Sequence, residues 1–327
     1  MTPMVDVMKL SRIFMPHFSG QMDYLEKNKI QLAYYTSSET ASKLITTQEL
    51  SLRDCRLMND SEEVSHGIAL IERLFADPSK SKRFREELEK ISPGVVQRGY
   101  AMFQEWKSVR KAESFLISFS RHAAPGTRLS KNEGEHGRLS MWRGYGGNEN
   151  VAMIFNVPFG QVAGPSLMLF FSSVGYFDSI DEQIEGIASN IAVEKTFLSS
   201  VPVEWLANTI FLTLVMGATC LKHPGFAEED EWRLIYLPST WQSRYIRIEE
   251  ESIRGKRERV CKLPISAFKS AGISGMDLGT LIDRVIVGPT QYPEQVRARV
   301  IEALNQAGVS NAEARVRLSG IPFRRKY

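Results

Sequence analysis

Cysteine is scarce in this chain, and the three residues present follow no recognisable pattern. Cys55, Cys220 and Cys261 form an odd and widely spaced set, which excludes a framework of paired disulfides and a zinc site built from closely spaced cysteine pairs. No basic and then apolar signal segment opens the sequence. The longest apolar stretch, residues 207–221, is shorter than the ~20 residues that cross a bilayer. We therefore expect a cytoplasmic protein without a membrane partner, in which this stretch is a buried helix.

A strong charge imbalance is also missing. The formal net charge is +3, too small to require nucleic acid or an anionic membrane as partner. Apolar residues make up 43% of the chain and charged residues 24%, which is enough apolar material for a core. The run from Arg244 to Arg259 mixes both signs, and we interpret it as a solvated face.

The common nucleotide and metal motifs are absent as well. No Gly-x-Gly-x-x-Gly pattern follows a strand, and no Gly-Lys-Ser/Thr phosphate loop exists. Gly144, Gly146 and Gly147 lack the strand-then-helix setting and indicate a turn. His122 and His136 lie in a polar stretch where solvated imidazoles are common. These observations predict no metal site.

Periodicity indicates an α+β protein. Apolar and polar residues alternate as in strands near residues 114–120 and 231–237, and we expect further strands near 31–35, 151–157 and 284–288. Residues 62–110 and 180–221 show helical patterns. Strands and helices follow one another without a regular βαβ rhythm. We expect an N-terminal arm or cap over residues 1–30 and one domain over residues 31–327, with a helical insertion at about 62–110.

The sharpest local signal is the segment Glu229–Tyr236. On a strand, Glu229, Glu231 and Arg233 share one face. Trp232, Leu234 and Tyr236 share the other, apolar face. Two carboxylates on one strand face can together orient a hydroxyl and stabilise positive charge developing nearby. The alternative is an exposed edge strand whose acidic residues provide solubility.

Five short motifs in order resemble an uncharacterised bacterial domain family, from about residue 31 to 325. The matching segments are Ala33-Tyr34-Tyr35-Thr36-Ser37, Asn59-Asp60-Ser61-Glu62-Glu63, Ser118-Phe119-Ser120, Met141-Trp142-Arg143-Gly144-Tyr145 and Glu229-Asp230-Glu231-Trp232-Arg233. That family in turn resembles the ADP-ribosyltransferase fold, which implies a split mixed sheet. In such enzymes an early strand holds NAD through His or Arg, a middle strand contacts the nicotinamide, and a late strand supplies a Glu for the nicotinamide ribose.

The resemblance implies roles for particular residues. The catalytic candidates are Glu231, on the ribose, and Glu229, on the acceptor. The candidates for binding NAD are Tyr34, Tyr35, Ser120, Trp142, Arg143 and Tyr145. Core packing is an equal alternative for Trp142 and Tyr145, and a surface ion pair is one for Arg143. We interpret Asn59, Asp60 and Glu62 as a turn that starts the next helix.

The resemblance thus predicts an NAD-consuming ADP-ribosyltransferase-like enzyme, in the manner of a toxin or phage-defence effector. NAD is its substrate, a protein or nucleic acid its acceptor, and an antitoxin or regulatory protein its expected partner. Tyr34 stands where the family has His, and this departure supports an alternative, a non-catalytic module that binds a nucleotide or a partner. A nuclease is disfavoured because the acidic residues lack a metal-binding grouping.

Overall fold

Helices and strands separate into two units along the chain. The computed structural model describes residues 5–57, 61–110, 113–123, 130–145, 147–157, 167–253, 255–274 and 277–322. Unit 1 comprises Met1–Asp23, Cys55–Ser114 and Ser172–Ala227, and unit 2 comprises Tyr24–Asp54, Phe115–Phe171 and Glu228–Tyr327. The predicted turn residues Asn59 and Asp60 lie outside the described residues, as does the side chain of Glu62.

Unit 1 is helical. Its helices are α1 (Val7–Phe14), α4 (Ser61–Ala76), α5 (Lys82–Glu89), α6 (Val95–Glu105), α10 (Asp181–Val193), α11 (Lys195–Leu198) and α12 (Val203–Cys220), and α2 (Pro16–Asn28) begins in it. The helical pattern predicted over residues 62–110 and 180–221 is confirmed. Within residues 1–30, where we expected an N-terminal arm or cap, the chain forms α1 and α2. Leu10, Ile13 and Phe14 explain α1, because their three- and four-residue spacing gives one buried face, and the Asp6 carboxylate accepts from the Lys9 amide as an N-cap.

Helix α12 contains the long apolar stretch. It is long and apolar enough to cross a membrane, but most of its residues are buried, as in the core helix of a globular protein. It packs closely against α4 and α6 within unit 1. A Cβ on Gly67 of α4 would lie 2.7 Å from a backbone oxygen of α12, and one on Gly99 of α6 would lie 2.6 Å from the Ile210 side chain. Helix α12 is therefore the helix against which both α4 and α6 pack.

Unit 2 holds the main sheet. Its strands are β1 (Gln31–Ser37), β2 (Glu49–Asp54), β3 (Phe115–His122), β4 (Glu149–Phe155), β8 (Glu231–Tyr236), β9 (Arg247–Ile253), β10 (Lys256–Pro264), β11 (Ile282–Thr290) and β12 (Val316–Leu318), and most of β5 (Leu169–Ser173). The order is β12-β11-β4-β1-β3-β2-β10-β9, with β8 pairing to β3 and β5. Strands β11 and β12 are parallel, and the other pairs among β1, β2, β3, β4, β8, β9, β10 and β11 are antiparallel. The predicted α+β class with a mixed sheet is confirmed, and the five expected strands all belong to this sheet.

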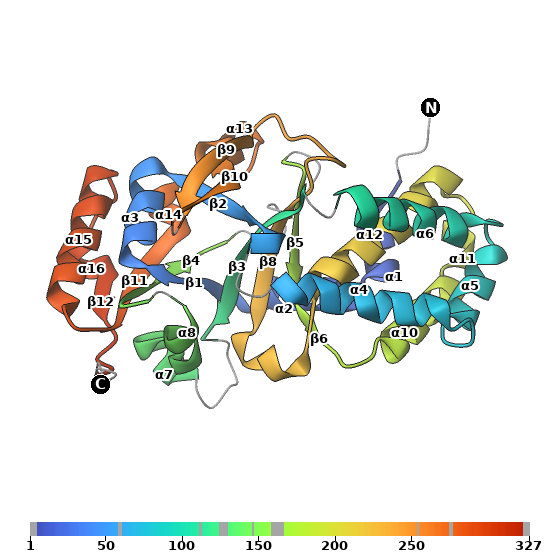
Figure 1. Ribbon diagram of the computed structural model, residues 1–327, viewed down its shortest axis with the longest axis horizontal. Coiled ribbons are helices and arrows are strands. Elements are labelled where there is room, and N and C mark those ends of the chain that lie inside the picture. Colours follow the sequence, from blue (N-terminus) through green and yellow to red (C-terminus); the bar gives the residue numbers. More distant parts are fainter. Residues whose placement is uncertain are drawn as a thin grey trace. The chain divides into compact units, whose positions relative to one another are not determined.

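The sheet divides at β3 (Figure 1). Strand β8 pairs with β3 from Phe115 to Ser120. Strand β1 pairs with residues 120–122 of β3, and β2 pairs with residues 115–116. Because β8 occupies one side of β3 at both places, β1 and β2 share the other side and diverge from it.

Helices of unit 2 connect and flank the strands. They are α3 (Ser38–Thr47), α7 (Ser130–His136), α8 (Leu139–Gly144), α13 (Ser266–Ser270), α14 (Leu278–Leu281), α15 (Pro293–Gln306) and α16 (Ala312–Arg315). The motif Met141–Tyr145 lies mostly in α8. Its carbonyl oxygen at Met141 accepts from the Tyr145 amide at 2.9 Å, which ends the helix there.

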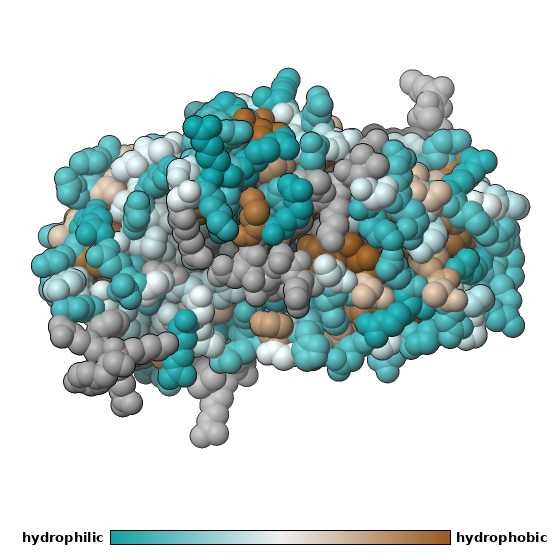
Figure 2. All heavy atoms as spheres, viewed as in Figure 1, coloured by the Kyte–Doolittle hydropathy of each residue, from teal (hydrophilic) through white to brown (hydrophobic). Residues whose placement is uncertain are grey.

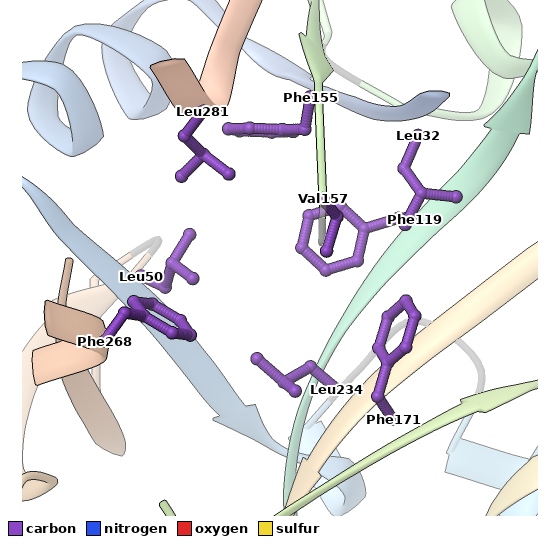
Figure 3. A pocket seen from close by; sticks show the side chains of 9 residues that line it. All are labelled: Leu32, Leu50, Phe119, Phe155, Val157, Phe171, Leu234, Phe268 and Leu281. Atoms are coloured by element: carbon purple, nitrogen blue, oxygen red, sulfur yellow. The ribbon is translucent and has the colours of Figure 1, made fainter. Parts of the chain in front are cut away.

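One face of the sheet carries the apolar core of unit 2. It encloses a cavity of about 30 Å³ toward which apolar side chains point (Figure 3). The lining residues are Leu32, Leu50, Phe119, Phe155, Val157, Phe171, Leu234, Phe268 and Leu281. Phe119 lies on β3 and Leu234 lies on β8. Because side chains alternate along a strand, the residues directly before and after each of them face the opposite side of the sheet.

The charged hairpin β9–β10 was missed as a pair of strands. Strand β9 lies at the edge of the sheet and is largely exposed, and hydrophilic residues gather over this hairpin in Figure 2. Arg257 and Glu250 form an exposed ion pair at 3.8 Å. The predicted solvated face is therefore confirmed, and its charges protect an exposed sheet edge from pairing with other chains.

Candidate functional site

The three segments that the resemblance singles out lie on adjacent strands. Strand β3 is the middle strand, with β1 on one side and β8 on the other. Ala33 of β1 is opposite Ser120 of β3, and Ser120 is opposite Glu231 of β8. Residues directly opposite in an antiparallel pair share a face of the sheet. Ser120 and Glu231, 111 positions apart in sequence, are therefore neighbours on one face.

A second pair completes a polar ladder, by which we mean Ser118, Ser120, Glu231 and Arg233. Ser118 is opposite Arg233 in the register of β3 and β8. The Ser120 hydroxyl donates to the Glu229 carbonyl at 2.7 Å. The Ser118 Oγ is buried and has no hydrogen-bond partner within the described part of the chain. The ladder thus contains one hydroxyl available to a ligand.

Glu231 and Arg233 form a buried ion pair. Arg233 Nε donates to Glu231 Oε1 at 2.7 Å, and Arg233 Nη2 donates to Oε2 at 3.0 Å. Glu231 is 6% exposed and Arg233 2%. The interpretation of this segment as an exposed edge strand is wrong, because β8 pairs with both β3 and β5 and all its residues are buried. Arg233 had no predicted role, although its place two residues after Glu231 put both on one face.

Glu229 lies at the entrance to β8 and is partly exposed. Its Oε1 accepts from the Tyr145 hydroxyl at 3.0 Å. Asp230, the next residue, has a left-handed backbone with φ of +48°, and its carboxylate accepts from Arg121 Nε at 2.7 Å. This bend separates the partly exposed carboxylate of Glu229 from the buried one of Glu231. The structure brings Glu229, Tyr145, Ser120 and Glu231 together.

Tyr35 and Trp142 lie in an apolar cluster on the same face as Ala33. Their rings meet edge to face with centroids 4.8 Å apart. Trp142 Nε1 donates to the His136 carbonyl at 2.9 Å, and a Cβ on Gly288 would lie 2.6 Å from the Trp142 ring. The Tyr35 hydroxyl accepts from the Arg138 amide at 2.7 Å, and burial raises the pKa of Tyr35. These contacts favour core packing for Trp142 over a ligand-binding role.

Tyr34 is not brought together with Glu231. It neighbours Tyr35 on β1 and therefore faces the opposite side of the sheet, where its ring lies 5.8 Å from that of Phe119. Burial raises the pKa of Tyr34, against the opposing effect of a hydrogen bond with Thr36. Alternation along the strand separates two candidates that are adjacent in sequence.

Arg143 is exposed at the end of α8. Within the described residues, no hydrogen bond or ion pair is recorded for it. Its guanidinium is therefore available to an anion, and the predicted surface ion pair with a Glu is not observed there.

Arg138 connects three parts of the candidate site and was not anticipated. Its Nη1 donates to the Glu228 carbonyl at 2.6 Å, and its Nη2 donates to the Arg121 carbonyl at 2.8 Å and to Glu133 Oε1 at 2.7 Å. Burial is the main cause that raises the pKa of Glu133. Arg138 thus fixes the segment before α8 against the end of β3 and the turn before β8. No sequence signal distinguishes it from other cations of a polar loop.

His122 is a buried histidine two residues beyond Ser120 on the same face of β3. It is 2% exposed, and its Nε2 lies 3.1 Å from Arg284 Nη2. Burial lowers the pKa of His122 to about 3, and the charges of Arg284 and Arg138 act in the same direction. The expectation of a solvated imidazole is therefore wrong for His122. His136, by contrast, is exposed, and its Nδ1 lies 2.6 Å from the Ser319 carbonyl.

The neutral state of His122 predicts a loss of stability in acid. The unfolded chain binds a proton at this residue near pH 6.5, but the folded protein does so only near 3. The contribution of neutral His122 to the free energy of unfolding is complete above pH 6.5. It is lost as pH falls toward 3, by about 1.4 kcal/mol per pH unit. Urea unfolding at pH 6.5 and 5.0 should show the wild type losing ~2 kcal/mol more than His122→Phe. Equal losses would show that His122 is not held neutral.

Metal ligands do not gather in the described part of the chain. No group of three or more His, Cys, Asp or Glu side chains suited to an ion is found there. Cys55, Cys220 and Cys261 are buried thiols without a disulfide.

Comparisons with known proteins give one partial match. Residues 141–234, from α8 to within β8, match the family described as Protein of unknown function (DUF2971). No curated protein and no solved structure matches the chain. The matched region includes Trp142, Arg143, Tyr145, Glu229 and Glu231, so the chain is similar to an uncharacterised family over a segment that contains five of the candidate site residues.

Proposed function

We propose that this protein is an ADP-ribosyltransferase-like enzyme that cleaves the nicotinamide–ribose bond of NAD and modifies a protein or nucleic acid. The observation that carries the proposal is the adjacency of β1, β3 and β8, with Ser120 and Glu231 opposite each other. The resemblance assigns the early segment to β1 and the late segment to β8, and Ser120, one of three candidates for the middle role, lies on β3. Their adjacency supports an ADP-ribosyltransferase-like split sheet, as does the division of the sheet at β3.

Glu231 is suited to stabilise positive charge. In the reaction the bond between the nicotinamide nitrogen and ribose C1′ breaks, and its electron pair leaves with nicotinamide. The ribose ring then carries developing positive charge, which a fixed carboxylate stabilises. Arg233 donates one hydrogen bond to each Glu231 oxygen. The ion pair therefore fixes the orientation of the carboxylate.

Glu229 is suited to the acceptor. Its carboxylate is partly exposed and hydrogen-bonded to Tyr145. An acceptor oxygen or nitrogen that attacks C1′ must lose its proton, and a carboxylate at the rim can receive it. This role in transfer is separate from the charge stabilisation by Glu231.

Two other side chains without an observed partner in the part of the chain that the structure describes are suited to the rest of NAD. Arg143 offers an exposed guanidinium, which matches phosphate geometry. The Ser118 hydroxyl, without a partner in the described residues, lies beside the ion pair. Tyr34 faces away from this group, so the proposal does not include it among the residues that bind NAD at Glu231.

A non-catalytic module is the second candidate. The specific observation that favours it is the buried ion pair, because Glu231 and Arg233 are both buried and form a salt bridge with each other. A sheet that retained its architecture and lost catalysis would keep such a pair for structure. On either reading, a toxin-like or phage-defence role would require a restraining partner, such as an antitoxin.

Incubation of the purified protein with NAD labelled in the adenylate part separates the two candidates. The enzyme releases free nicotinamide and places label on an added protein or nucleic-acid acceptor. A binding module raises its melting temperature with NAD, because the ligand binds only the folded state, but releases no nicotinamide. If NAD neither is cleaved nor raises the melting temperature, both the enzyme and the NAD-binding module are contradicted.

A further inference from the structure

His122 carries a buried hydrogen-bond donor that the protein does not use. A guanidinium can only donate hydrogen bonds. Because Arg284 Nη2 lies 3.1 Å from His122 Nε2, that nitrogen must be the unprotonated acceptor. The proton of the neutral ring is then on Nδ1. Nδ1 is buried and has no hydrogen-bond partner among the described residues.

An unused buried donor is costly to the folded protein. Other polar groups near this site are occupied. Arg284 Nη1 donates to Gln31 at 3.2 Å and pairs with Asp283, and Arg138 pairs with Glu133. The Nδ1–H group of His122 is the exception among them, and it requires an acceptor from outside these side chains.

The charges around the ring favour an anionic acceptor. Arg284 and Arg138 lie close enough to oppose protonation of His122, and only Asp283 acts in the opposite direction. The guanidinium of Arg284 lies directly against the ring, 3.1 Å from Nε2. An anionic oxygen at Nδ1 would accept a charge-assisted hydrogen bond, which is stronger than one between neutral groups.

The position of His122 connects this donor to the polar ladder. His122 and Ser120 are two residues apart and share a face of β3, so their Cα atoms are about 7 Å apart. Ser120 is opposite Glu231. A ligand with its ribose at Glu231 can extend along β3 and place a phosphate at His122.

We propose that His122 Nδ1 donates a hydrogen bond to a phosphate oxygen of the dinucleotide, as part of an anion-binding subsite with Arg284 and Arg138. The identity of the ligand rests on the proposed function, whereas the anion site rests on His122 and its neighbours. Because Nδ1 is closed to solvent, the anion reaches it through a local opening of the surrounding segment.

Titration with sodium pyrophosphate tests the subsite directly. In protein labelled with ¹⁵N-histidine, the Nδ1–H signal of His122 should shift saturably with pyrophosphate and should not shift with sodium chloride of equal ionic strength. Loss of this charge-assisted hydrogen bond in His122→Phe should weaken pyrophosphate binding about tenfold to a hundredfold. His223→Phe is the matched control, because His223 is an exposed histidine of unit 1.

The outcomes separate the subsite from the proposed activity. A silent His122 signal at saturating pyrophosphate overturns the subsite, as does an equal shift with sodium chloride, which would indicate an adventitious ion only. NAD cleavage by wild-type protein with a silent His122 would retain the activity and remove the subsite. A shifted His122 without NAD cleavage would retain the anion site and remove the activity. Should His122→Phe fail to fold, the wild-type titration alone decides.

Discussion

Glu231→Gln is expected to abolish NAD cleavage and also to lower stability. The amide keeps the size of the side chain but loses the charge that stabilises a cationic transition state. Loss of one such contact costs ~3–4 kcal/mol, about a hundredfold to a thousandfold in rate. Free nicotinamide from wild type and variant, measured at a temperature where both are folded by circular dichroism, gives the ratio. Stability also falls, because Arg233 is left as a buried cation without its carboxylate.

Glu229→Gln is the matched control for this experiment. It makes the same chemical change two residues away, at a partly exposed carboxylate that accepts from Tyr145. We expect a smaller effect on NAD hydrolysis and a larger one on transfer, since Glu229 is assigned to the acceptor. Equal NAD cleavage by wild type and Glu231→Gln would remove Glu231 from the mechanism.

Arg233→Met is expected to destabilise the protein strongly. Methionine retains much of the apolar length of the side chain but removes both hydrogen bonds to Glu231, which is 6% exposed. Removing one partner of a buried ion pair costs ~3–5 kcal/mol, because the remaining charge is buried and unpaired. Urea unfolding of the wild type and the variant measures this difference in the free energy of unfolding.

The double variant Glu231→Gln/Arg233→Met tests whether an unpaired buried charge causes this loss of stability. If the unpaired charge is responsible, the double variant loses less stability than the sum of the two single variants, because no buried charge is left. Additive losses would indicate that each side chain contributes through separate contacts. Arg257→Met, at an exposed ion pair with Glu250, should change stability little and serves as the surface control.

Alternation explains why much of the sheet could be predicted from the sequence. Phe115, Ile117 and Phe119 share one face of β3, with Leu116, Ser118 and Ser120 between and after them, and the register of β3 with β8 continues the same faces. The terminal helix α1 and the charged hairpin β9–β10 were harder. The first is short, and strand β9 of the second has no buried apolar face, since its position at the edge of the sheet leaves it exposed.

The site was less predictable because its contacts are not local. Glu231 and Arg233 were placed on one face by their spacing, but the spacing did not reveal that this face is buried. That depends on β3 and β5 pairing on both sides of β8, which only long-range contacts determine. The Arg138 network likewise joins Glu228, Arg121 and Glu133, and no periodicity relates these residues.

The sequence by itself determined the α+β class, most strands and helices, and a set of candidate residues that includes Ser120, Glu229 and Glu231 but not Arg138 or Arg233. Those features depend on local alternation and helical spacing, which are written into neighbouring residues. The tertiary structure alone decided that Ser120 is opposite Glu231, that Tyr34 faces away from them, and that His122 is buried with an unused donor. The reason is physical: strand register and burial arise from the pairing of distant segments, and a side chain acquires its charge state and partners only within that pairing.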